Sequence, residues 1–139
     1  MKKKYDILDV TADIGIVAYG NNQKSLFENA AIGMFGLIVD PEKINVKETI
    51  NVKVESDNLE DLLVAWLNEL LFIFETREFI MKDCRVNEMD EKRLIAKIKG
   101  EHFNPDIHPR SVHIKAATYH DLEIKKDNSG WRAKVIFDV

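Results

Sequence analysis

One long apolar stripe at helical spacing constrains the fold of this chain more than any other feature. Its members recur every third or fourth residue: Leu59, Leu62, Leu63, Trp66, Leu67, Leu70, Leu71 and Phe74. This spacing predicts an amphipathic helix that begins after Asp57, with Glu60 in its first turn, where the helix dipole favours negative charge. Asn68 and Glu69 interrupt the apolar run, so we expect a buried helix rather than a membrane span.

A second, shorter pattern predicts a helix over residues 25–38. Ser25 and Glu28 have the spacing of a capping box, in which each side chain bonds a free backbone N–H at the start of the helix. Apolar residues then recur at helical spacing, and the helix is expected to end before a proline. Gly33 and Gly36 weaken this helix in isolation, so we expect it to pack closely against a sheet.

Most of the remaining apolar segments alternate with polar residues, which is the pattern of half-buried β-strands. Strands are predicted over residues 4–10, 14–19, 44–55, 79–86, 93–99, 111–125 and 131–139. Residues 127–130, DNSG, favour a hairpin turn between the last two of them. No repeat or linker interrupts the pattern, so we expect a single domain over residues 1–139. Two helices packed on antiparallel strands make an α+β fold.

Net charge and cysteine content argue against several function classes. The net charge of −4 shows no basic excess, so strong direct binding to nucleic acid is not expected. Cys84 is the single cysteine, which argues against an internal disulfide and a cysteine zinc cluster; we expect a small buried hydrophobic residue. The basic N-terminal residues lack the apolar segment of a signal peptide, which predicts a cytoplasmic protein without membrane contact.

Carboxylates at the ends of two predicted strands are the candidates for metal binding. Asp13 precedes the strand over residues 14–19, whereas Asp138 and the carboxylate of Val139 end the last predicted strand. Hard cations such as Ca²⁺ and Mg²⁺ prefer oxygen ligands of this kind. From spacing alone, a solvated strand end is the simpler interpretation of Asp138 and Val139.

His120 and Lys115 both fall in the predicted strand over residues 111–125. Because side chains alternate between the two faces of a strand, His120 shares a face with apolar residues, whereas Lys115 lies on the more polar face. We therefore expect His120 to be a hydrogen-bonded core residue rather than a catalyst, and Lys115 to be solvated.

The other polar candidates have structural interpretations as well. Glu69 borders the apolar stripe and is expected to be a flanking charge or to bond a neighbouring strand. His102 and His108 lie in a predicted loop over residues 101–110, where histidines are usually exposed. No nucleophile elbow and no glycine-rich phosphate loop is present in the sequence.

Five segments in a fixed order carry a family resemblance. They are TADIGIVAYG (11–20), SLFENAAIGMF (25–35), LLVAWLNELL (62–71), KAATYH (115–120) and the terminal pair Asp138-Val139. Together they span nearly the whole chain, and the chain closely resembles the archease family. One departure is Val10, which stands where that family usually has a histidine.

The resemblance implies a function that the residues alone do not give. Archeases are accessory proteins that activate RtcB-type RNA ligases in tRNA splicing and RNA repair, by promoting guanylylation and repeated turnover of the ligase. They are also implicated in modulating RNA-modifying enzymes such as methyltransferases. The family fold is α+β and contains a strand-helix-strand-strand unit. On this basis we expect a non-catalytic protein.

The resemblance also implies a divalent-cation site formed by Asp13, Asp138 and Val139. Calcium is the cation seen in the family, and oxygen ligands do not distinguish it from magnesium or manganese. A polypeptide extension after Val139 is then expected to displace the terminal carboxylate. His120, Lys115 and Glu69 match family motif positions and are second-rank candidates for shaping the site.

Two other functions remain open at this point. A small metal-dependent hydrolase acting on nucleotide or RNA ends could use Asp13, Asp138 and His120. A general chaperone would instead present an exposed apolar patch to its clients.

Overall fold

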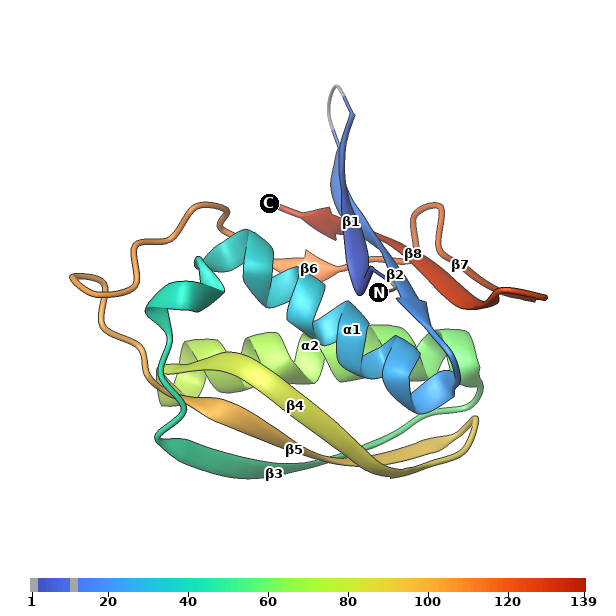
Figure 1. Ribbon diagram of the computed structural model, residues 1–139, viewed down its shortest axis with the longest axis horizontal. Coiled ribbons are helices and arrows are strands. Elements are labelled where there is room, and N and C mark those ends of the chain that lie inside the picture. Colours follow the sequence, from blue (N-terminus) through green and yellow to red (C-terminus); the bar gives the residue numbers. More distant parts are fainter. Residues whose placement is uncertain (1–2, 11–12) are drawn as a thin grey trace.

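The computed structural model describes residues 3–10 and 13–139. Its elements, in chain order, are β1 (Tyr5–Val10), β2 (Asp13–Gly20), α1 (Gln23–Ile38), η1 (Pro41–Lys43), β3 (Glu48–Glu55), α2 (Leu59–Arg77), β4 (Phe79–Met89), β5 (Arg93–His102), β6 (Ala116–Ala117), β7 (Glu123–Asp127) and β8 (Gly130–Asp138) (Figure 1). The predicted α+β class is confirmed, with two α-helices and antiparallel strands.

The strands form two sheets rather than one. The larger sheet has the order β1-β2-β8-β6, with β7 also paired to β8, and the smaller has the order β3-β5-β4. Figure 1 shows the two helices between these sheets, and α1 contacts both β2 and β4. The succession β3-α2-β4-β5 is the expected strand-helix-strand-strand unit, and it builds the smaller sheet with α2 packed against it.

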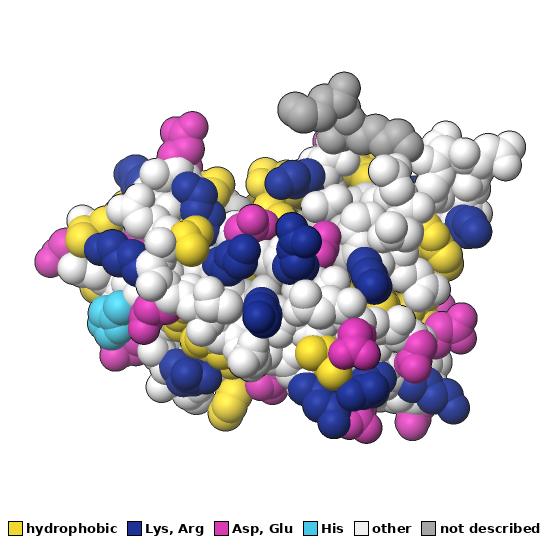
Figure 2. Space-filling model, turned by 60° about the horizontal axis from the view of Figure 1, so that its bottom comes forward, with side chains coloured by type: hydrophobic (Ala, Val, Ile, Leu, Met, Phe, Trp, Pro, Cys, Tyr) yellow, Lys and Arg dark blue, Asp and Glu magenta, His cyan; other side chains and the backbone are white. Residues whose placement is uncertain are grey.

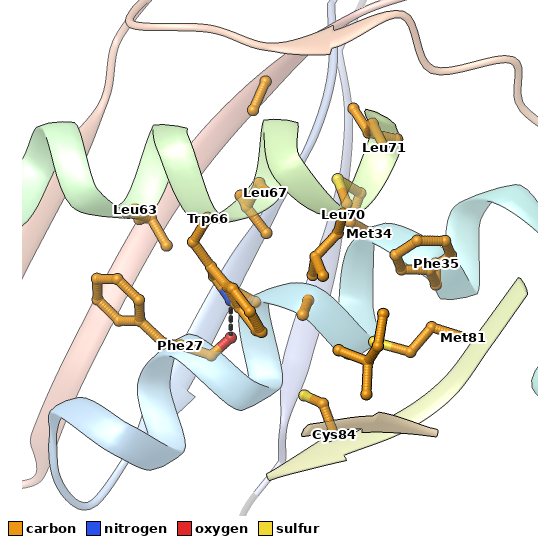
Figure 3. Packing of buried hydrophobic residues seen from close by; sticks show 14 of the residues in the cluster. Phe27, Met34, Phe35, Leu63, Trp66, Leu67, Leu70, Leu71, Met81 and Cys84 are labelled. Atoms are coloured by element: carbon orange, nitrogen blue, oxygen red, sulfur yellow. Dashed lines mark hydrogen bonds between the residues drawn. The ribbon is translucent and has the colours of Figure 1, made fainter. Parts of the chain in front are cut away.

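The apolar stripe of α2 supplies much of the core. All eight of its members are buried, as predicted. The helix α1 buries residues around most of its circumference, which is what a helix enclosed between two sheets requires. The indole N–H of Trp66 donates to the carbonyl of Phe27 at 3.0 Å, so a hydrogen bond joins the two helices inside the core (Figure 3).

The N-cap residue of each helix differs from the one that the sequence predicts. The cap of α1 is Asn22, whose side chain accepts the N–H of Ser25 at 2.8 Å, while the Ser25 hydroxyl accepts the N–H of Asn22 at 3.2 Å. Ser25 is therefore the third helical residue and not the cap. Glu28 instead accepts the N–H of Val86 on β4 at 2.8 Å. For α2 the cap is Asn58.

The predicted strand over residues 111–125 is wrong. Two short strands stand in its place, β6 (Ala116–Ala117) and β7 (Glu123–Asp127), and β7 continues past the predicted end. The N–H groups of Ser111 and Val112 donate to the last carbonyls of α1, at 2.8 and 3.1 Å, so this backbone is held by the helix end instead of a sheet. The other predicted strands differ from those found only at their ends, and the predicted hairpin joins β7 to β8.

The two glycines of α1 allow β1 to lie against the helix. A methyl group on Gly33 would lie 2.9 Å from the ring of Tyr5, and one on Gly36 would lie 2.6 Å from its hydroxyl. Their expected role in close packing against a sheet is confirmed.

Candidate functional site

The register of the larger sheet brings two predicted ligands together. Ile14 of β2 and Phe137 of β8 are the last paired residues at this end of the two strands, and Asp13 and Asp138 each lie one residue beyond that pair. Both side chains are exposed, and Val139 beside them is exposed as well. The strand ends therefore form an acidic tip, defined here as Asp13, Asp138 and Val139.

A third strand completes this end of the sheet. Ala116 of β6 pairs with Asp138, and the N–H of Lys115 donates to the carbonyl of Asp138 at 2.7 Å. The backbone of Lys115 therefore holds the C-terminal end of β8 in place beside the acidic tip. The side chain of Lys115 is exposed, as predicted.

His120 lies beside the acidic tip and not in the core. Its side chain is 62% exposed, and its Nε2 lies 3.9 Å from a carboxylate oxygen of Asp13 and 3.4 Å from one of Asp121. The expectation of a core histidine is wrong because the chain leaves β6 after Ala117. It then turns, with Asp121 in the left-handed region at φ 51°, so the strand alternation does not extend to residue 120.

Three side chains hold the turn that carries His120. The hydroxyl of Thr118 donates to the carbonyl of Ile136 at 2.8 Å and accepts the N–H of His120 at 3.2 Å. The hydroxyl of Tyr119 donates to the carboxylate of Asp61 on α2, and this bond raises the pKa of the phenol. The turn is thus tied to both β8 and α2.

Asn68 is the residue that the sequence interpretation missed. Its carboxamide accepts the N–H of Ala117 at 2.8 Å and donates to the carbonyl of Ala117 at 3.2 Å. The carboxamide thereby makes the two backbone hydrogen bonds that a neighbouring strand would otherwise make, and it holds β6 against α2. A polar residue inside an otherwise apolar stripe was the available signal. Glu69, the next residue, is half-buried on the same helix.

The acidic tip offers the right donor type for a hard cation. Carboxylate oxygens are the ligands that Ca²⁺, Mg²⁺ and Mn²⁺ prefer. Among the described residues, no group of three His, Cys, Asp or Glu side chains already stands together as a metal cluster. The third donor would be the main-chain carboxylate of Val139. Thr11, Ala12 and the side chain of Val10 lie outside the described part of the chain.

A second polar cluster is buried under the segment over residues 103–110. The predicted loop began too early, because β5 extends to His102, whose side chain is exposed. His108 is fully buried, and its Nδ1 accepts the N–H of Asn104 at 3.0 Å, which leaves Nε2–H to donate to Glu101 at 3.0 Å. Glu101 also accepts the N–H of Asn45 at 2.7 Å, and this bond is the main cause that lowers the pKa of Glu101. The expectation of an exposed His108 is wrong, and the buried pair is a structural anchor for the loop.

An open pocket of about 720 Å³ lies at the other end of β2 and β8 from the acidic tip. Its lining includes Lys4, Tyr19, Trp131 and Arg132. The hydroxyl of Tyr19 donates to Asp6 at 2.7 Å and lowers the pKa of that carboxyl. None of the six predicted site residues lines this pocket. No helix within the described residues is both long enough and apolar enough to cross a membrane.

Comparison with known proteins places the chain among relatives of the same length. The family model described as the Archease protein family (MTH1598/TM1083) matches residues 5–139. The protein named archease from Methanosarcina acetivorans is 44% identical over 141 residues, covering 99% of this chain and 97% of that protein. The protein named archease from Sulfurisphaera tokodaii is 36% identical over 139 residues, covering 99% of both.

Two solved structures share the fold. The solution structure of Methanobacterium thermoautotrophicum protein 1598 has a TM-score of 0.81 and 33% identity, covering 98% of this chain and 99% of that one. The crystal structure of a Thermotoga maritima protein, described as an archease and possible chaperone, has a TM-score of 0.65 and 20% identity, covering 100% and 98%. At that identity the second match supports the fold alone. The family match over nearly the whole chain and the close curated relatives confirm the resemblance seen in the sequence: this chain belongs to the archease family.

Proposed function

We propose that this chain is a non-catalytic accessory protein that activates an RtcB-type RNA ligase in tRNA splicing and RNA repair. It would promote guanylylation and repeated turnover of the ligase through a divalent cation held at the acidic tip. Membership of the archease family supports the accessory role. The observation that supports the cation site is the sheet register, in which Asp13 and Asp138 each lie one residue beyond the terminal pair Ile14–Phe137.

Electrostatics explain why a cation belongs there. Asp13 and Asp138 lie at the same end of the paired strands β2 and β8, where like charges repel each other, and the carboxylate of Val139 adds to the repulsion. A bound cation removes this cost. Asp13, Asp138 and Val139 would hold it, and calcium, magnesium or manganese fits the oxygen donors. When bound, the cation supplies a positive charge that can orient phosphate oxygens in the ligase active site.

The second-rank residues act on the geometry of the tip in this proposal. His120 faces Asp13 and limits where its carboxylate points. Lys115 fixes the backbone of Asp138 through its N–H. Glu69 is next to Asn68, the residue that holds β6 against α2. Glu69 would therefore affect the tip only indirectly, through its place on α2.

The described side chains favour an accessory protein over an enzyme. Burial raises the pKa of the Cys84 thiol strongly, so this cysteine is not a nucleophile. The proximity of His120 to Asp13 is the one feature that favours a small metal-dependent hydrolase instead. Modulation of methyltransferases and a cytoplasmic location belong to the same proposal by family resemblance.

A guanylylation assay separates these functions. The ligase is incubated with GTP and Mn²⁺ or Mg²⁺, with and without this protein, and the labelled ligase and the joined RNA per ligase are counted. We expect Asp13→Asn and Asp138→Asn to lose the stimulation, whereas Asp57→Asn, at an exposed position in the β3–α2 connection, retains it. A chelator titration is the metal control.

Two results would overturn the proposal. If both folded tip variants stimulate the ligase as fully as the wild type, the acidic tip is not the activating element. If the protein alone consumes GTP or cleaves RNA ends, and Asp13→Asn abolishes this, the hydrolase is the better account.

A further inference from the structure

Lys and Arg side chains gather on the outer face of the smaller sheet. Side chains alternate along its strands, so that Val52, Ala96 and Val86 point toward the helices and are buried. Arg85 and Lys97 point the other way and are exposed. Figure 2 views this side of the molecule and shows dark blue side chains over the middle of the face, with acidic side chains among and around them.

The register places three of these cations side by side. Lys97 of β5 lies directly opposite Arg85 of β4, and Lys99 follows Lys97 two residues along the same strand. Adjacent strands are about 4.8 Å apart, and alternate residues of one strand about 6.7 Å apart. We define Arg85, Lys97 and Lys99 as the basic face.

This arrangement is unfavourable for the protein alone. Like charges directly opposed across a strand pair are destabilising. Within the described residues, no carboxylate lies within 4.0 Å of the cationic groups of Arg85, Lys97 or Lys99. Asp83, which pairs with Lys99 in the register, accepts the N–H of Cys84 at 2.9 Å. A chain of net charge −4 thus keeps Arg85 and Lys97 opposed to each other, with no carboxylate within 4.0 Å of either cationic group among the described residues.

The β7–β8 hairpin provides a contrast within the same molecule. Lys125 and Arg132 are also directly opposed there. Each of them has an acidic partner, however: Lys125 lies 3.6 Å from Glu123, and Arg132 lies 3.9 Å from Asp127. Opposed cations are therefore neutralised within the protein in the hairpin and left open on the basic face.

We propose that the basic face binds the phosphodiester backbone of a single-stranded nucleic acid. Three cations close together on two paired strands can contact neighbouring phosphates of one nucleic-acid strand. The face belongs to a three-stranded sheet, and a flexible single-stranded nucleic acid can follow its surface, whereas a duplex is read by an element that enters a groove.

The composition of the face argues against a protein partner. Protein interfaces have an apolar, aromatic-rich centre. The exposed large hydrophobic residues of the described chain are Ile7, Val46, Phe72, Ile107, Tyr119 and Val139, and none of them lies in β3, β4 or β5. With no aromatic platform for base stacking, binding is weak, independent of sequence and sensitive to salt.

The inference does not rest on the proposed function, because the basic face and the acidic tip belong to different sheets. The two helices lie between those sheets, so the outer face of β3-β5-β4 points away from the sheet that carries Asp13 and Asp138 (Figure 1). A nucleic acid bound to the basic face would therefore leave the acidic tip accessible.

Fluorescence anisotropy with labelled oligouridylate and oligothymidylate of about 20 nucleotides tests the proposal without any ligase. Three phosphate contacts give a slope of about −2 in log affinity against log salt, so affinity should fall roughly 20-fold between 50 and 200 mM salt. We expect the variant Arg85→Gln/Lys97→Gln/Lys99→Gln to lose this binding, because all three phosphate contacts are removed. Each lost contact should also reduce the magnitude of the salt slope by about 0.7.

The hairpin supplies a control with the same change of residue types and charge: Lys125→Gln/Lys126→Gln/Arg132→Gln. This variant should bind as the wild type does, and circular dichroism checks that both variants fold. An equal loss of oligonucleotide affinity in the two variants would show that only the net charge matters, and it would overturn the proposal. No binding by the wild type at 50 mM salt would overturn it as well. Tighter binding of polyglutamate than of either oligonucleotide would point to an acidic protein instead.

Discussion

Replacing Asn68 by alanine tests how the site is held together. The substitution removes both hydrogen bonds to Ala117, at 2.8 and 3.2 Å, and leaves the N–H and C=O of a residue that is only 5% exposed without partners. Each unpaired buried group costs about 1–3 kcal/mol. Alanine is the better helix former by up to about 0.7 kcal/mol, which offsets part of this cost. Two such groups, less the gain in helix propensity, give an expected fall in the free energy of unfolding of about 1–5 kcal/mol.

Urea denaturation followed by circular dichroism gives this difference. The control is Asn51→Ala, the same chemical change at an exposed position on β3, which should stay within about 0.5 kcal/mol of the wild type. Amide exchange adds a local readout, because the N–H of Ala117 should exchange faster in the Asn68 variant. An Asn68→Ala protein as stable as the Asn51→Ala protein, with Ala117 still protected, would refute the role of Asn68 in holding β6.

Three further perturbations have defined outcomes. The lowered pKa of Glu101, caused first by the N–H of Asn45, stabilises the fold fully above the ordinary pKa of 4.5. That contribution is lost as pH falls through the lowered folded pKa, so the acid part of a stability–pH curve should flatten in Glu101→Gln. The buried thiol of Cys84 should resist a thiol reagent until urea unfolds the chain, and rapid labelling of the native protein would contradict its burial. Gly100→Ala should cost about 3 kcal/mol or more in thermal unfolding, because the new methyl group would overlap the backbone carbonyl of Ile80; an unchanged Tm would contradict the close strand contact.

Local periodicity was enough to predict the helices. The stripe from Leu59 to Phe74 is a property of consecutive residues, and every member is buried. The helix starts were harder, because Asn22 and Ser25 are both good caps three residues apart. The choice between them depends on where the preceding strand ends, which local sequence does not determine.

Tertiary contacts explain the errors around His120 and His108. Alternation from Val112 to His120 is a strand pattern, but the N–H of Val112 bonds the end of α1, a partner far away in sequence. His108 is buried because its loop folds back onto Glu101, and no local pattern encodes that return.

Only part of the candidate site could be predicted, because the rest depends on contacts between residues far apart in the sequence. Asp13 and Asp138 each follow or precede an apolar run, so their places at strand ends could be predicted, and the family resemblance indicated that the two ends meet. Asn68 could not be assigned, because its partner Ala117 is 49 residues away. The basic face was missed because a net charge of −4 averages over the whole chain and hides a local cluster.

A calcium titration of the isotopically labelled full chain, followed by NMR, tests the cation site most directly. The account predicts saturable shifts confined to the acidic tip and its neighbours, around Asp13, Lys115, His120, Asp138 and Val139. Asp138→Asn should abolish them, and magnesium or manganese should compete for the same site. No saturable shift at these residues, or unchanged binding in the Asp138→Asn variant, would contradict the central claim that the acidic tip holds a divalent cation.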